Sequence, residues 1–68
     1  MHLYYDRVSK MFTLDTEEDV EFLGPITNAL VVLRHKFELT PSQAREATLQ
    51  AFFNGGDAVC LDDVKRIS

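Results

Sequence analysis

This sequence of 68 residues has little of several residue types that small proteins use for stability or catalysis. A single cysteine, Cys60, excludes an internal disulfide and fits a reducing compartment. With three glycines and two prolines, the chain shows no linker, no low-complexity segment and no glycine-rich phosphate loop. Zinc sites usually need four Cys or His ligands in close pairs, whereas Cys60, His35 and His2 are scattered. The sequence therefore predicts no metal and no cofactor.

The sequence also lacks the features of an enzyme and of a membrane protein. No carboxylate pair or oxyanion loop accompanies Cys60 and the histidines, and a domain this small has little room for a ligand pocket. The longest dense apolar stretch, Ile26 to Phe37, is too short to span a bilayer and carries Arg34 and Lys36. No signal peptide is visible at the start of the sequence. We therefore expect a non-enzymatic cytoplasmic protein with no small-molecule substrate.

Positive charge is scarce: 7 basic side chains stand against 11 acidic ones, for a formal net charge of −4. Binding along a phosphate backbone needs clustered Lys and Arg, so this balance disfavours nucleic acid as a partner without excluding a local basic face. The length indicates one small domain over residues 1–68, with marginal stability.

The apolar stretch predicts a central helix over Pro25–Phe37. Its large side chains repeat at helical spacing, and they are Ile26, Leu30, Leu33 and Phe37. Gly24-Pro25 either separates this helix from a preceding one or kinks one long helix, because proline suits the first helical position but not the interior.

A second helix is predicted over Pro41–Phe53. Thr40 can cap its start, Pro41 can occupy the first position, and Gln43 stands where a capping box needs it. Asn54-Gly55-Gly56 ends this helix, since glycine readily adopts the left-handed conformation of a helix C-terminus.

The N-terminal third is open to two interpretations. Spacings of three and four favour a helix over His2–Phe12, whose apolar face comprises Met1, Tyr4, Tyr5, Val8, Met11 and Phe12. The alternative is a β-hairpin in which Leu3–Tyr5 pairs with Met11–Leu14, since the residue types suit strands. A further short helix ending near Leu23 is predicted, with Asp15 or Thr16 as its cap.

The C-terminal segment is predicted to be extended over Ala58–Leu61 and then helical, with Asp62 as cap, and one short helix from Ala58 is the alternative. Leu39–Ser68 thereby has the outline of a helix-turn-helix. Its leucine-threonine-proline start and its aromatic-then-glycine end resemble the last helical pair of a bacterial sigma factor, over less than half of the chain. That resemblance implies DNA binding, but Asp62 and Asp63 would face the phosphates. The residues of this alternative are Arg34, Lys36, Arg45, Lys65 and Arg66.

The aromatic side chains outnumber what one small core needs. Adjacent rings point in different directions on a helix, so one of each pair lies near the surface, where exposed aromatics indicate a partner surface. Acidic side chains near Glu17 offer a second contact for a basic partner, although each also suits a helix N-terminus. The predicted partner-binding residues are Tyr4, Tyr5, Phe52, Phe53, Glu17, Glu18 and Glu21.

Together these patterns predict a mainly α fold, a compact bundle of three or four short helices, with an α+β fold containing an N-terminal β-hairpin as the alternative. The expected function is a protein-interaction module, a regulator or inhibitor of the kind that phages and mobile elements encode. It is expected to bind a protein partner or itself as a homodimer, because a symmetric contact would bury the surplus apolar side chains. A helix-turn-helix-like transcription regulator is the alternative.

Overall fold

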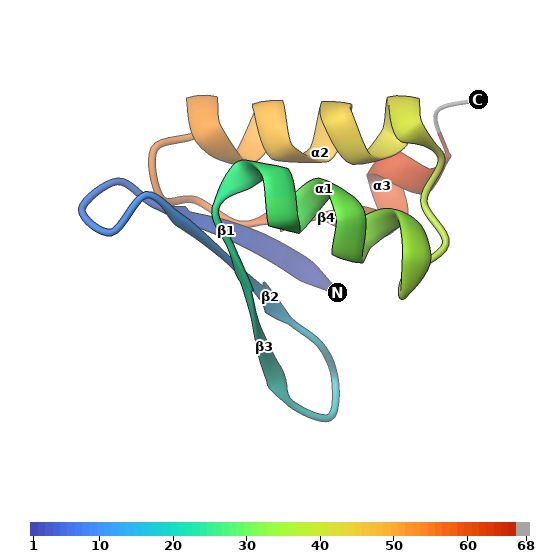
Figure 1. The fold of residues 1–68 in the computed structure, drawn as a ribbon, viewed down its shortest axis with the longest axis horizontal. Helices are drawn as coiled ribbons and strands as arrows, with labels where there is room; N and C mark the ends of the chain where they lie inside the picture. Colours follow the sequence, from blue (N-terminus) through green and yellow to red (C-terminus); the bar gives the residue numbers. More distant parts are fainter. Residues whose placement is uncertain (67–68) are drawn as a thin grey trace.

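The computed structural model describes residues 1–66, which form an antiparallel sheet with helices on one face. The elements in order are β1 (His2–Asp6), β2 (Met11–Asp15), β3 (Val20–Gly24), α1 (Ile26–His35), α2 (Pro41–Phe53), β4 (Val59–Cys60) and α3 (Leu61–Lys65). The strand order is β3-β2-β1-β4, and α1 and α2 lie side by side over the sheet (Figure 1). The fold is therefore α+β, and the predicted mainly α bundle is wrong.

The first two strands form the hairpin that was the alternative for this segment, so the predicted helix over His2–Phe12 is wrong. Leu3 pairs with Leu14, and Tyr5 pairs with Phe12. All four side chains point toward the helices, because alternate residues of a strand face the same side of a sheet. The pairing of β1 with β2 thus brings the apolar side chains of both strands together on one face of the sheet.

The segment predicted as a capped helix ending near Leu23 is instead a turn followed by β3. The hydroxyl of Thr16 accepts a hydrogen bond from the Asp19 amide at 3.0 Å and donates one to the Asp19 carbonyl at 2.7 Å. The Thr16 and Asp19 pattern, which can cap a helix elsewhere, therefore closes the β2–β3 turn. Gly24, at a φ of +81°, then turns the chain from β3 into α1. The kinked-helix alternative is wrong as well.

Both central helices are confirmed. The backbone of Pro25 precedes α1 at its N-cap position. The capping box of α2 is complete, because the Gln43 amide donates to the Thr40 hydroxyl at 3.1 Å and the Thr40 amide donates to the Gln43 side-chain oxygen at 3.0 Å. Local sequence signals were therefore sufficient to predict α1 and α2.

The C-terminal segment is extended and then helical, as predicted, but α3 begins at Leu61, so Asp62 lies in its first turn and does not cap it. The extended part is β4, in which Cys60 pairs with His2 of β1. Ile67 and Ser68 lie outside the described residues.

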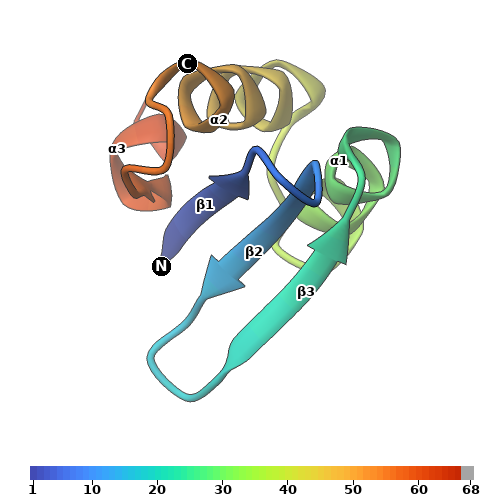
Figure 2. The same ribbon diagram turned by 90° about the vertical axis from the view of Figure 1, so that its left-hand side faces the viewer.

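The core lies between the sheet and the helices. Its largest buried side chains come from all three long strands, α1 and α3, while α2 contributes small residues that let it pack closely. The buried hydrophobic residues are Leu3, Phe12, Leu14, Leu23, Ala29, Leu33, Leu39, Ala44, Ala47, Ala51, Val59, Leu61 and Val64. Both helices lie on one side of the sheet (Figure 2). On the other side Tyr4, Val20 and Phe22 are exposed.

Candidate protein-interaction groove

Four aromatic rings from distant parts of the chain meet at the C-terminal end of α2. The Tyr5 ring lies 4.8 Å from the Phe12 ring and 5.2 Å from the Phe52 ring, centroid to centroid. Phe52 in turn contacts Phe53 edge-on at 5.4 Å. Tilted and edge-on ring pairs of this kind add stability beyond the area they bury. The cluster joins the β1–β2 hairpin to α2 and continues to the molecular surface.

A hollow of about 290 Å³ opens beside this cluster, where α1 begins and α2 ends. Its walls are almost wholly apolar, with one cation, and are formed by Tyr5, Lys10, Phe12, Pro25, Ile26 and Phe52. Ile26 is 45 % exposed, Phe52 47 % and Phe53 74 %. Large side chains left this open next to a hollow are typical of a surface that a partner covers.

A second hollow, of about 300 Å³, lies further along the same two helices. Leu30 and Arg34 line it from α1, and Pro41 and Arg45 line it from the start of α2. The first hollow joins Ile26, at the start of α1, to Phe52, near the end of α2, and the second joins Arg34, near the end of α1, to Pro41, at the start of α2. The two helices therefore run antiparallel, and the two hollows lie along one line between them.

We call this line the α1–α2 groove. Residues three and four apart share one flank of a helix. On α1 this flank carries Ile26, Leu30 and Arg34, and on α2 it carries Pro41, Arg45, Leu49 and Phe52. The floor is apolar, and its cations lie at the ends: Lys10 beside Phe52, and the arginine pair near Pro41.

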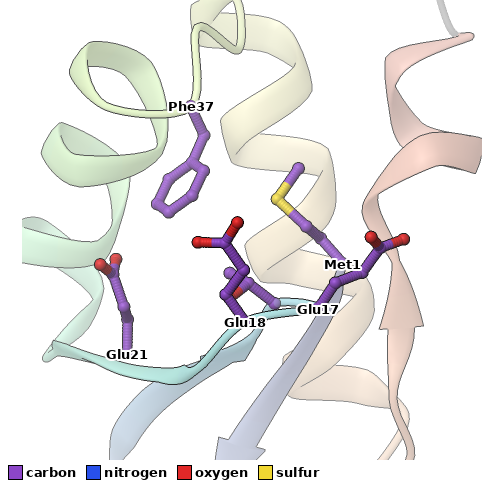
Figure 3. Close-up of a pocket in the computed structure, with 6 residues that line it drawn as sticks. Met1, Glu17, Glu18, Glu21 and Phe37 are labelled. Atoms are coloured by element: carbon purple, nitrogen blue, oxygen red, sulfur yellow. The ribbon is translucent and has the colours of Figure 1, made fainter.

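A third hollow, of about 380 Å³, lies elsewhere, between the β2–β3 turn and the segment after α1 (Figure 3). Glu17, Glu18 and Glu21 line it together with Met1 and Phe37. Figure 3 shows the three carboxylates spread around the hollow rather than converging on one point. Within residues 1–66, no three His, Cys, Asp or Glu side chains are placed to hold a metal ion.

The predicted partner-binding residues divide among three surfaces. Tyr5 and Phe52 line the first hollow of the groove, and Phe53 contacts Phe52 beside it. Tyr4, next to Tyr5 in the strand, points to the opposite face of the sheet. The predicted glutamates form the acidic hollow, where Glu21 is paired with Lys36.

The basic residues of the nucleic-acid alternative are also dispersed. Arg34 and Arg45 share the second hollow, whereas Lys36 binds Glu21 on the other flank of α1. Lys65 and Arg66 belong to the α3 end, where the Lys65 carbonyl accepts a hydrogen bond at 3.1 Å from a side chain on the other flank of α2. A helix-turn-helix outline is interrupted by β4, which joins the sheet.

Sequence reasoning missed the groove because it assigned Ile26 and Leu30 to the core face of the central helix. In fact Ala29 and Leu33 form the centre of that face, so the residues beside them line the groove. Leu49 was not among the predicted partner-binding residues. The available signal was a row of residues at a spacing of four on each helix, Ile26, Leu30 and Arg34 on α1 and Pro41, Arg45 and Leu49 on α2.

One carboxyl group outside the groove has a shifted pKa. Hydrogen bonds from the Val8 amide at 2.9 Å and the Ser9 hydroxyl at 3.1 Å lower the pKa of Asp6, because they stabilise its charged form. These contacts hold the β1–β2 turn, next to Lys10 of the groove.

Comparisons of the chain with protein-family models, curated proteins and solved structures give no match. Within residues 1–66, no helix is long and apolar enough to cross a bilayer. Function is therefore inferred from the surfaces of the chain itself.

Proposed function

We propose that this chain is a non-enzymatic protein-interaction module, a small regulator or inhibitor that binds its partner through the α1–α2 groove and acts in the cytoplasm. The observation that supports this proposal is the continuity between the exposed side chains of Ile26, Phe52 and Phe53 and the hollow between the helices. Anchors of this kind carry most of the binding energy of protein interfaces when a partner removes them from water.

The arrangement of the groove also supports a role in binding a partner. Its position between two helices that pack on a sheet makes it rigid, so little conformational entropy is lost when a partner docks. The contact between Phe52 and Tyr5, at 5.2 Å, holds one wall in place before binding. Leu49 is 40 % exposed, and Phe53, although it contacts Phe52, is 74 % exposed, so both offer apolar surface to a partner.

The test compares three forms of the chain as baits in a lysate of the organism that encodes it. One is the wild type, one (the groove variant) carries Leu49→Ser in the groove and Phe53→Ser beside it, and one carries Phe22→Ser on the opposite sheet face. Phe22 is 80 % exposed and Phe53 74 %, so Phe22→Ser removes a surface ring comparable with the one that Phe53→Ser removes. Because these side chains are exposed, we expect each substitution to change stability by about 0.5 kcal/mol or less, which thermal melts monitor.

The proposal predicts a protein that the wild type and Phe22→Ser both retain and the groove variant loses, identified by mass spectrometry. Equal retention by all three forms, or a loss confined to Phe22→Ser, overturns the groove as the binding surface.

A further inference from the structure

The charges around the α1–α2 groove differ in sign from those of the protein as a whole. The chain carries a net charge of −4, yet α1 contains no acidic residue, and the one acidic residue of α2 is Glu46. Glu46 accepts a hydrogen bond from Gln50 at 3.0 Å, on the flank of α2 that faces away from α1. The groove is thus a positive strip on an acidic protein.

Arg34 and Arg45 are the centre of this strip. Within residues 1–66 neither guanidinium forms an ion pair, although Lys36 binds Glu21 and Arg66 lies 4.0 Å from Asp63. Both arginines line the same hollow, one from each helix. Arginine binds carboxylates through two parallel hydrogen bonds, so the pair provides donors for acidic side chains of a partner.

The secondary structure of the groove walls limits the backbone conformation that a bound partner segment can have. The two long walls are helices, whose backbone groups are already bonded within each helix, and the β1–β2 hairpin closes only the end of the groove at Tyr5, Lys10 and Phe12. A partner seated there must satisfy its own amide and carbonyl groups, because the groove offers none. A helix does so, while an extended peptide needs a strand edge.

The length and floor of the groove fit a short amphipathic helix. At ~1.5 Å per residue, α1 offers a wall about 15 Å long. The apolar floor of Ile26, Leu30, Leu49 and Phe52 would receive side chains spaced three and four apart on the partner. Lys10 at one end and the arginine pair at the other would then flank that apolar stripe.

We infer that the α1–α2 groove binds an acidic amphipathic helix of a partner protein, with its apolar face on the groove floor and its carboxylates on Arg34 and Arg45. This inference rests on the proposed function, to which it adds the conformation and the charge of the partner.

The test uses two synthetic helical peptides of about four turns, identical in their leucine stripe. One carries glutamates and the other carries lysines beside that stripe. Fluorescence anisotropy gives the Kd of each for the intact chain, and amide chemical shifts locate the peptide. We expect the glutamate peptide to bind about tenfold more tightly, with shifts confined to α1 and α2, and a smaller preference at high salt because ions screen exposed charges.

The double variant R34E/R45E should reverse the order of the two affinities. The matched control K65E/R66E makes the same change of charge at α3 and should keep the order seen in the wild type. Equal affinities for both peptides, no binding of the glutamate peptide, or shifts centred on β3 or the open sheet face would overturn the inference.

The two proposals fail in distinguishable ways. Capture that is lost in the groove variant, combined with equal affinities for the two peptides, refutes the acidic helix and leaves the groove as a binding surface. Capture that survives the groove variant refutes the proposed function, whatever the peptides do.

Discussion

The rings of Tyr5 and Phe52 lie 5.2 Å apart and join the first strand of the chain to the last turn of α2. Both residues had been expected at an intermolecular surface, yet each already has an aromatic neighbour within the chain. Part of the surplus of aromatic rings thus packs the β1–β2 hairpin against α2. What remains exposed is the outer edge of this cluster, which forms one end of the groove.

The core prediction concerns Leu33, which is fully buried between α1 and the sheet. Leu33→Ala removes buried methyl groups and leaves a cavity, so we expect a loss of about 2–5 kcal/mol in the free energy of unfolding. Urea denaturation measures it, with exposed Val31→Ala as the control. A loss below about 0.5 kcal/mol, typical of surface positions, would contradict the packing of α1.

The cap of α2 gives a second prediction. Thr40→Ala removes the hydroxyl that accepts the hydrogen bond of the Gln43 amide, and we expect a cost of about 1 kcal/mol. Hydrogen exchange should accelerate at the start of α2, over residues 42–44. Unchanged exchange there would show that the cap does not hold the helix start.

The lowered pKa of Asp6 gives a third prediction. A carboxyl whose pKa is lower in the folded state adds stability above its unfolded pKa, and this contribution is lost as the pH falls through the folded pKa. A ¹³C-detected titration should therefore place the pKa of Asp6 below its ordinary value of 3.8. Asp6→Asn should abolish the corresponding pH dependence of the turn. A titration at or above the ordinary value would contradict the hydrogen bonds to Val8 and Ser9.

Self-association is a separate expectation, since Tyr4, Val20 and Phe22 leave an apolar patch on the open sheet face. We expect sedimentation equilibrium to show a dimer whose thermal midpoint rises with protein concentration. Phe22→Ser should weaken the dimer, and Phe53→Ser beside the groove serves as the control. A monomer mass at high micromolar concentration would contradict the homodimer.

The two long helices could be predicted because their signals are local. The Thr40-Pro41-Ser42-Gln43 cap and the spacing of Leu30 and Leu33 act within a few residues. These signals gave positions close to those observed for α1 and α2. Helical geometry also predicted that one ring of the Phe52–Phe53 pair lies near the surface, and the structure leaves Phe53 74 % exposed.

The sheet could not be predicted in the same way, because strand pairing depends on residues far apart in the chain. Spacings such as Tyr5 to Phe12 fit a helical face and a paired register equally well until the partner strand is known. The Thr16–Asp19 pattern serves a helix cap and a strand turn alike. The segment that contains Phe22 was therefore predicted as a short helix, although Phe22 projects into solvent from β3.

The groove itself required tertiary structure. Arg34 and Arg45 were assigned to nucleic-acid contact because their residue type was known and their neighbours were not. Only the antiparallel packing of α1 on α2 brings them to one hollow with Leu30 and Pro41.

The most direct test of the groove is photo-cross-linking in living cells. The photoreactive residue p-benzoylphenylalanine replaces Leu49 on the groove in one version of the chain and Phe22 on the open sheet face in another. We expect irradiation to yield a covalent adduct with a foreign protein from position 49, and from position 22 no adduct other than one with a second copy of the chain. An adduct from position 22 with none from position 49 would contradict the groove as the partner-binding surface.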